Sequence, residues 1–368
     1  MTPNPRPPFR AEHIGSLLRP KRLREAHRRH GEGALSAAGL HAVQDDCVRE
    51  VVRMQEEAGL QAVTDGEFRR ASYWMHFVAA IDGFTIGTAA FQFQDDSGAR
   101  SAFTCPEVVR KLARKHSAAG DEYAFLAAAT SRTPKITMPS PSTLHFWRGG
   151  TGLPPAAYRD DAAFFADLTA IYRAEIADLA RAGCRYIQID EVPIVMLCDP
   201  HVRDQVRARG EDPDALVTQY IAAINDAVRE RPADMVAGVH MCRGNYKGRW
   251  LSEGGYDGVA ERLFNEAKVD VFFLEYDTAR AGDFAPLRFL PPGKHAVLGL
   301  VSSKVATLED GDALRRRLDE AAKVVPLDRL GLSPQCGFAS AAGGNPVTED
   351  SQRAKLRLCC DVAHDVWR

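Results

Sequence analysis

The sequence lacks any long hydrophobic run. Hydrophobic residues make up 45% of its 368 residues, but no stretch approaches the ~20 consecutive apolar residues that a membrane-spanning helix requires. The early basic residues Arg6, Arg10 and Arg19 are not followed by the apolar segment of a secretory signal peptide. We therefore expect neither a membrane partner nor a secretory leader.

The chain has no marked excess of charge of either sign. It contains 47 Lys and Arg against 49 Asp and Glu, which gives a formal net charge of −2. Domains that bind nucleic acids usually carry a basic surface, so we expect no nucleic-acid partner. We find no internal repeat, low-complexity tract or clear linker, and predict a single domain over residues 1–368.

Cysteine is sparse and never occurs as a CxxC pair. The eight cysteines are scattered along a chain that is too large to need disulfides for folding. This usage predicts a reducing, cytoplasmic location. Cys47, Cys184 and Cys359 lie within apolar helical or strand patterns, where a thiol usually serves as a small hydrophobic side chain.

Short apolar runs alternate with longer segments of helical period. Eight runs are typical of strands, several of them apolar throughout: FRAEHIG, LQAVTDGE, PKITMPS, CRYIQIDE, DMVAGVHM, VDVFFLEY, KHAVLGLVSS and RLGLSPQC. Six segments are helical candidates: Ser36–Gly59, Asp161–Gly183, Pro213–Arg229, Gly258–Ala267, Thr307–Val324 and Asn345–Val366. This alternation predicts a parallel sheet covered by helices.

Polar residues stand at the C-terminal end of nearly every predicted strand. They are His13, Asp65, Glu67, Asp190, Glu191, His240, Cys242, Glu275, Ser302, Ser303 and Cys336. In an eight-stranded (β/α)₈ TIM barrel this end carries the active site. An open doubly wound sheet would gather such residues mainly at one switch point. We therefore predict an α/β fold of the TIM-barrel type, with the open sheet as the alternative.

Residues 80–130 interrupt the alternation between the second and third predicted strands. The pattern GFTIGTAAFQF within this insertion predicts a small hairpin, followed by helices. Long ordered loops commonly cover a functional site. We expect the insertion to do so here.

Four residues at predicted strand ends have side chains that suit a soft metal ion. His240 and Cys242 follow one apolar run, Glu275 ends the next, and Cys336 follows the last. Zinc is bound by thiolate, imidazole and carboxylate groups in a tetrahedral set. Without a CxxC pair the pattern is only moderately specific. The alternative is four unrelated polar residues, each hydrogen-bonded within its own loop.

The sequence resembles the catalytic C-terminal barrel of cobalamin-independent methionine synthase and its single-barrel relatives, from about Arg10 to the C-terminus. The matching motifs are HIGS (His13–Ser16), DGEFRR (Asp65–Arg70), PSPSTL (Pro139–Leu144), IQIDE (Ile187–Glu191), HMC (His240–Cys242), FLE (Phe273–Glu275) and PQCG (Pro334–Gly337). The resemblance implies a catalytic zinc ion at His240, Cys242, Glu275 and Cys336. It also implies that the zinc activates the thiol of homocysteine for methylation.

The same resemblance assigns residues that hold the amino-acid substrate. Glu67 and Asp190 match the catalytic-site carboxylates that bind the amine, and the backbone of Ile14, Gly15 and Ser16 matches the loop that binds the carboxylate. The alternative for Asp190 and its neighbour Glu191 is a capping or salt-bridging role in the strand-end loop. Trp147 falls where the synthases stack a tryptophan on the folate ring, although it equally suits packing at the barrel rim.

Two departures from the family pattern affect the methyl donor. We expect no counterpart of the synthases' additional N-terminal barrel, which helps to bind the folate polyglutamate, because the first predicted strand begins near Arg10. Val301 also stands where the synthases have a histidine that protonates the departing folate. Ser302, Ser303 and Lys304 are nearby polar groups, but none is an equivalent acid with a pKa near neutrality.

The sequence therefore predicts a zinc-dependent methyltransferase (or alkyltransferase) that activates a thiol, with homocysteine favoured as the acceptor and methionine as the product. The donor stays open between a folate, a corrinoid and another methyl compound. Alternatives are epoxide opening by another thiol such as coenzyme M, a metal-free decarboxylase-like barrel and a non-catalytic binding barrel. The oligomeric state is also open, with a homo-oligomer among the options.

Overall fold

Six parallel strands form the centre of the protein. The computed structural model describes residues 6–148 and 153–367. Within these ranges each of the six strands pairs with the next: β7 (Ile136–Pro139), β8 (Tyr186–Glu191), β9 (Val236–Met241), β10 (Val271–Glu275), β11 (His295–Val301) and β12 (Leu330–Pro334). Nearly every residue in them is buried, as expected for strands covered by helices.

Two further segments extend this sheet towards a ring. Strand β1 (Ala62–Val63) pairs in parallel with β6 (Thr133–Pro134), which leads directly into β7. At the other edge, Ala11 forms an isolated parallel bridge with Leu332 of β12. The order of segments is that of the predicted TIM barrel, although within the described ranges no regular ladder closes the ring.

The first predicted strand, around FRAEHIG, is wrong as a regular strand. The chain there is extended but forms only the isolated bridge at Ala11. Pro7 and Pro8 have no N–H to donate to a ladder, and Gly15 turns the backbone with a φ of 140°. The gap to the second strand is spanned by a hydrogen bond from Leu17 N to the carbonyl oxygen of Gly66, 3.1 Å long.

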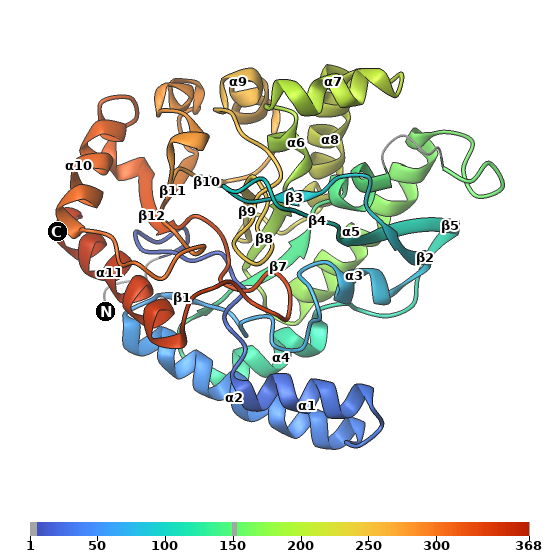
Figure 1. The fold of residues 1–368 in the computed structure, drawn as a ribbon, viewed down its shortest axis with the longest axis horizontal. Helices are drawn as coiled ribbons and strands as arrows, with labels where there is room; N and C mark the ends of the chain where they lie inside the picture. The colour runs from blue at the N-terminus through green and yellow to red at the C-terminus, as the bar shows by residue number, and fades with distance from the viewer. Residues whose placement is uncertain (1–5, 149–152, 368) are drawn as a thin grey trace.

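Helices surround these strands, and the two ends of the chain lie on the same side (Figure 1). The α-helices are α1 (Lys21–Gly31), α2 (Ala37–Ala58), α3 (Met75–Ala79), α4 (Gly120–Ala129), α5 (Asp161–Arg181), α6 (Pro193–Met196), α7 (Pro200–Ala208), α8 (Pro213–Val228), α9 (Asp257–Glu266), α10 (Gly311–Ala322) and α11 (Glu349–Val366). Short 3₁₀ helices are η1 (Ser142–Leu144), η2 (Phe146–Arg148), η3 (Ala279–Ala281), η4 (Ala285–Phe289) and η5 (Leu327–Arg329). All six predicted helices are present, within a few residues of the expected bounds.

The insertion folds as two hairpins and one helix, α4. Strands β2 (Ile81–Thr88) and β5 (Thr104–Arg114) form the long antiparallel hairpin, and β3 (Phe93–Gln94) pairs with β4 (Arg100–Ser101) between them. Gln94 N donates to the carbonyl oxygen of Trp250 over 2.8 Å, and Trp250 N donates back over 3.0 Å. The predicted hairpin is therefore confirmed, and it is anchored to the loop that follows β9.

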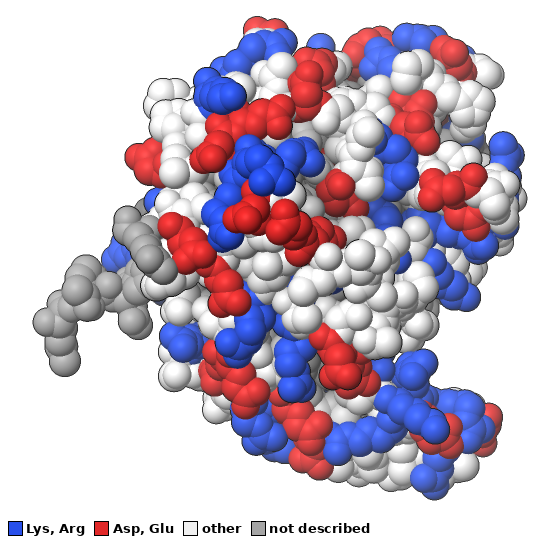
Figure 2. Space-filling model, turned by 60° about the vertical axis from the view of Figure 1, so that its left-hand side comes forward, with Lys and Arg blue, Asp and Glu red and all other residues white. Residues whose placement is uncertain are grey.

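The surface agrees with the balanced composition. On the face drawn in Figure 2, basic and acidic side chains are interspersed over most of the surface. Across residues 6–148 and 153–367, none of the helices is both long and apolar enough to cross a membrane.

Candidate metal centre and substrate cavity

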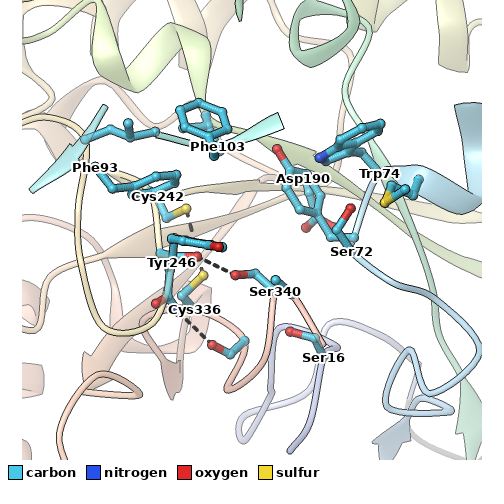
Figure 3. Close-up of a pocket in the computed structure, with 18 of the residues that line it drawn as sticks. Ser16, Ser72, Trp74, Phe93, Phe103, Asp190, Cys242, Tyr246, Cys336 and Ser340 are labelled. Carbon is cyan, nitrogen blue, oxygen red and sulfur yellow. Dashed lines mark hydrogen bonds between the residues drawn. The ribbon is translucent and has the colours of Figure 1, made fainter. Parts of the chain in front are cut away.

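Three of the four predicted metal ligands meet in one buried group. His240 lies in β9 and Cys242 directly follows it, while Cys336 follows β12. Their ligand atoms all lie within 4.8 Å of one another. The two Sγ atoms are 3.9 Å apart, and Figure 3 shows the two thiols pointing towards each other.

This donor set fits a zinc ion. Two thiolates bound tetrahedrally at the usual Zn–S distance of about 2.3 Å stand about 3.8 Å apart, close to the 3.9 Å between these sulfur atoms. An imidazole completes a set of three soft donors, which is the number that catalytic zinc sites commonly take from the protein. The group is able to hold a metal ion without rearrangement of its two sulfur atoms.

Hydrogen bonds and nearby charges shift the pKa values of these three residues. His240 Nδ1 lies 3.2 Å from Asp190 Oδ1. Burial lowers the pKa of His240, but hydrogen bonds with Asp190 and Cys336 outweigh it and raise the pKa to about 10. The pKa of Cys336 is well below its ordinary value, chiefly because of its hydrogen bond with Cys242, whose own pKa is raised by the same bond and by burial. A metal ion bound here would displace the remaining protons.

Glu275, the fourth predicted ligand, lies outside this group. It ends β10, and Oε2 accepts a 2.7 Å hydrogen bond from Arg243 N. Oε1 lies 2.9 Å from Lys304 Nζ. Burial would raise the pKa of Glu275, but Lys304 and Arg243 outweigh burial and the pKa is lowered. The carboxylate is thus ionised, and both of its oxygen atoms already have partners.

A cavity of about 310 Å³ opens above the three donors. His240, Cys242 and Cys336 form one part of its lining, and Glu67 and Asp190 form another. Among the described residues that line it, none is Lys or Arg. The cavity therefore combines soft metal donors with two carboxylates, without Lys or Arg among its described lining residues.

Glu67 is held in this cavity in an unusual backbone conformation. Its φ is 60°, which is uncommon for a residue other than glycine, and its N–H donates to Asp65 Oδ1 over 2.8 Å. Oε1 accepts a 2.8 Å bond from Thr137 Oγ1, while Oε2 is buried without a hydrogen bond to any described residue. Burial raises the pKa of Glu67 to about 7, with Arg70 acting in the opposite direction and Asp190 adding to the rise.

The predicted carboxylate-binding loop lies beside Glu67. Ile14 and Ser16 line the cavity, and no described residue accepts a hydrogen bond from the N–H groups of residues 14–16. Gly15 lies behind the lining, where a Cβ would stand 2.7 Å from Thr137 Cγ2 and 3.3 Å from Glu67 Oε1. Only glycine allows the loop to approach Glu67 this closely.

One side of the cavity is aromatic. Trp147 lines it together with Phe93 and Phe103 of the insertion and Tyr246, and we call these four residues the aromatic wall. The centroid of Phe103 lies 5.3 Å from that of Trp147 and 4.9 Å from that of Phe93, which in turn lies 5.3 Å from Tyr246. Trp147 therefore both lines the cavity and packs at the rim. The alternating pattern of the insertion indicated a cover, but not which side chains would face inward.

Other rim residues have structural roles. Glu191 accepts a 2.7 Å bond from Ile194 N at the start of α6, as the capping alternative predicts. The side chain of Arg243 donates to the carbonyl oxygen of Gly254, so its guanidinium is committed to the loop. Val301 is fully buried at the end of β11 and is not among the described residues lining the cavity.

Comparisons with known proteins agree with this architecture. Residues 9–365 match the family model described as the catalytic domain of cobalamin-independent synthase. An uncharacterized protein of Bacillus subtilis, YxjH, is 42% identical over 98% of this chain and 95% of its own length. A methionine synthase of Saccharolobus solfataricus is 28% identical over 88% of this chain and 86% of its own length.

Two solved structures are similar over nearly the whole chain. A putative vitamin-B12 independent methionine synthase from Listeria monocytogenes has a TM-score of 0.79 and 34% identity, and the match covers 99% of this chain and 100% of that one. A B12-independent methionine synthase from Shewanella, solved with selenomethionine, has a TM-score of 0.73 at 21% identity, with 97% of both chains covered; this second likeness concerns the fold. On the family match and the Bacillus relative, the chain belongs to the cobalamin-independent methionine synthase catalytic-domain family.

Proposed function

We propose that this protein is a zinc-dependent methyltransferase that methylates the thiol of homocysteine. The observation that carries the proposal is the buried group of His240, Cys242 and Cys336 in a cavity that also contains Glu67 and Asp190. The family match and the methionine synthase relative support the same reaction class.

The three donors would hold the metal, and a free position would be left for the substrate sulfur. A zinc ion at these residues would lower the pKa of a bound thiol and deprotonate it at neutral pH. Asp190 holds the imidazole of His240 through Nδ1. This contact would leave Nε2, which lies 3.3 Å from the carbonyl oxygen of Gln335, as the ring nitrogen that binds a metal. In the reaction a C–S bond forms, and the bond from the methyl group to its carrier breaks, with the electron pair leaving on the carrier.

Charge favours an amino-acid thiol over a sulfonate thiol. The ammonium group of homocysteine would find Glu67, whose Oε2 is buried without a hydrogen bond from any described residue, and Asp190 beside it. Its carboxylate would find the N–H groups of residues 14–16. The sulfonate of coenzyme M would meet these two carboxylates and no Lys or Arg among the described lining residues, so electrostatic repulsion would oppose its binding.

The methyl donor would approach along the aromatic wall. Aromatic faces suit a planar or apolar group and offer nothing to an anionic tail. Val301 has no proton to give, so the carrier would leave without a proton from that position. We infer a donor whose reacting part is recognised by stacking, with its identity to be fixed by assay.

Zinc content and ligand binding test the proposal. The purified protein should contain zinc near one equivalent; a metal-free protein would instead favour the decarboxylase-like alternative. Calorimetric titration of the zinc-loaded protein should show homocysteine binding at least about tenfold more tightly than coenzyme M, a difference of about 1.4 kcal/mol. Tight binding of coenzyme M alone would reject homocysteine as the acceptor. Methyltetrahydrofolate, methylcobalamin and simple methyl donors can then be compared in parallel.

A further inference from the structure

The aromatic wall lies beside the loop that carries Cys242. A Cβ added at Gly244, two residues after Cys242, would stand 3.0 Å from Cε1 of Phe93. Figure 3 shows the rings of Phe93, Phe103 and Tyr246 on the same side of the cavity as the two thiols. A methyl group carried by a compound that contacts this wall would therefore lie close to a substrate sulfur at the candidate metal centre.

The rings of the wall face in different directions. The plane of Phe103 is inclined by 64° to that of Phe93 and by 84° to that of Trp147. Rings at such steep angles suit a compact, rounded group better than an extended flat one. The face of each ring carries partial negative charge, and aromatic cages of this kind bind quaternary ammonium groups.

The charged groups around the cavity also favour a cation. The described lining includes Glu67 and Asp190 but neither Lys nor Arg. Lys247 Nζ lies 5.2 Å from the centroid of Tyr246, but Lys247 is exposed and is not part of this lining. A positively charged donor would therefore meet attraction from the carboxylates and the ring faces, without repulsion from a basic side chain in the lining.

The size of the cavity favours a small donor. Its volume of about 310 Å³ is at the lower end of the roughly 300–1,000 Å³ that is usual for small-molecule sites. Homocysteine, bound between the candidate metal centre and the two carboxylates, would occupy part of this volume. The remaining space beside the aromatic wall suits a compact methyl compound.

We propose that the methyl donor is a small methyl onium ion, a sulfonium or a quaternary ammonium compound, held by cation–π contacts with the aromatic wall. This inference rests on the proposed function. In the transfer a bond forms between the homocysteine sulfur and the methyl carbon, and the bond from that carbon to the onium sulfur or nitrogen breaks. The electron pair of the broken bond stays on the leaving atom, which departs in a neutral thioether or amine.

Val301 is compatible with this transfer. The proton of the homocysteine thiol passes to solvent when the thiolate forms, and a neutral thioether or amine leaves without needing a proton. The buried Val301 side chain, which has none to give, is therefore no obstacle. The thiolate and the onium ion also lose their opposite charges as the products form, a change that apolar surroundings favour because they solvate ions poorly.

Binding of a charged and an uncharged probe of the same shape tests the inference without an activity assay. Choline has an uncharged analogue in which carbon replaces the nitrogen. Zinc-loaded protein saturated with homocysteine, which occupies the carboxylates, should bind choline about tenfold more tightly than this analogue in calorimetric titrations. Phe103→Leu keeps an apolar side chain but removes the aromatic face, so the preference should fall to about threefold or less.

Two further variants complete the binding test. Trp147→Leu removes a second ring of the wall and should reduce the preference in the same way. Phe91→Leu changes an aromatic residue of the same insertion that is not among the described lining residues, and should keep the full preference. Thermal unfolding of each variant identifies any that does not fold.

Methyl transfer then distinguishes the two onium classes. With homocysteine, trimethylsulfonium should yield methionine and an equal amount of dimethyl sulfide, or tetramethylammonium should yield methionine and trimethylamine. A protein that binds neither zinc nor homocysteine would overturn the proposed function. Normal binding of both, with equal affinity for choline and its uncharged analogue, would overturn only the onium donor, as would transfer from methyltetrahydrofolate or methylcobalamin alone.

Discussion

Among the single residues of the cavity, Glu67 shows two features that a purely structural side chain would avoid. A residue other than glycine at φ 60° stores strain of about 1–3 kcal/mol. A buried carboxylate oxygen without a hydrogen-bond partner is also unfavourable. Strain and unmet hydrogen bonding together are typical of a binding site whose ligand supplies the missing partner.

The raised pKa of Glu67 predicts a pH dependence of ligand binding. The folded protein keeps a proton on this carboxyl that the unfolded chain releases, between the ordinary value of 4.5 and about 7. Raising the pH through this window therefore costs stability but generates the carboxylate that an ammonium group needs. Methionine has no thiol and so reports on this subsite alone. Its Kd should fall about tenfold from pH 6 to pH 8, one pKa unit on either side of the midpoint.

Calorimetry across this pH range is the measurement, and Glu67→Gln is the informative variant. Its amide does not titrate, so methionine should bind weakly at every pH and the slope should disappear. The exposed Glu57→Gln is a matched control that should keep the slope. A slope that survives in Glu67→Gln would assign the titration to another group.

Much of this site could be predicted at the residue scale, because parallel strands bring their C-terminal ends together. Glu67 follows β1, Asp190 ends β8 next to Glu191, His240 and Cys242 stand at the end of β9, and Cys336 follows β12, and all five line one cavity. The pairing of Glu275 with Lys304 could not be predicted in the same way. It depends on the path of the loop after β11, which hydrogen bonds between three distant segments determine.

Among the secondary-structure elements, the β2–β5 insertion has the clearest functional consequence. It supplies Phe93 and Phe103 to the aromatic wall, and its inner hairpin is bonded to Trp250. The three candidate metal donors, in contrast, stand at the ends of β9 and β12. Under the proposed function, the insertion would therefore affect binding of the methyl donor more than binding of the thiol acceptor.

Truncation of Phe103 should weaken binding of the methyl donor without weakening binding of the thiol acceptor. Phe103→Ala removes the ring that contacts Phe93 and Trp147. We expect the KM for the methyl donor to rise about tenfold, the size of one aromatic contact of about 1.4 kcal/mol, with little change in the Kd of homocysteine. Steady-state kinetics and calorimetry measure the two quantities. Val109→Ala, at a site 45% exposed on the same hairpin, is the control and should alter neither.

Whether a helix or strand could be predicted from the sequence depended on how many apolar residues it buries and on clear signals at its ends. Helix α2 was predictable because Ser36 caps its start and Gly59, with a φ of 103°, ends it. Helices α1 and α7 were not, since each buries only two residues and so contains few apolar residues to mark it in the sequence. The second predicted strand is shorter than expected. Only two of its residues form β1, because the chain turns soon afterwards at Gly66 and Glu67, both of which have a positive φ.

In the molecule as a whole, side chains inside the barrel help to complete the ring that the backbone ladder leaves open. Lys135, between β6 and β7, has its Nζ 3.2 Å from Glu12 Oε2 in the N-terminal segment, and both side chains are fully buried. Tyr186 of β8 donates to the other oxygen of Glu12 over 2.7 Å. Glu12 therefore connects the first segment to the sheet through the interior.

Removal of Lys135 should destabilise the entire domain. Lys135→Met leaves Glu12 buried without its cation, and breaking a buried pair in this way costs roughly 3–5 kcal/mol. Urea denaturation should show this loss with an unchanged m value. Adding Glu12→Gln should recover part of it. Lys111→Met, which removes an ion pair whose side chains are 72% and 32% exposed, should cost less than about 1 kcal/mol; an equal loss in both lysine variants would contradict the interior role.

Asp190 contacts His240 and also lines the cavity, so under the proposed function one carboxylate would take part in two binding events. If bound zinc changes the affinity for an amino acid by some factor, the bound amino acid must change the affinity for zinc by the same factor. The resistance of the bound zinc to chelators would then depend on the supply of methionine or homocysteine. The protein would bind zinc with a different affinity in a cell rich in these amino acids than in a starved cell, even if the amounts of protein and zinc were the same.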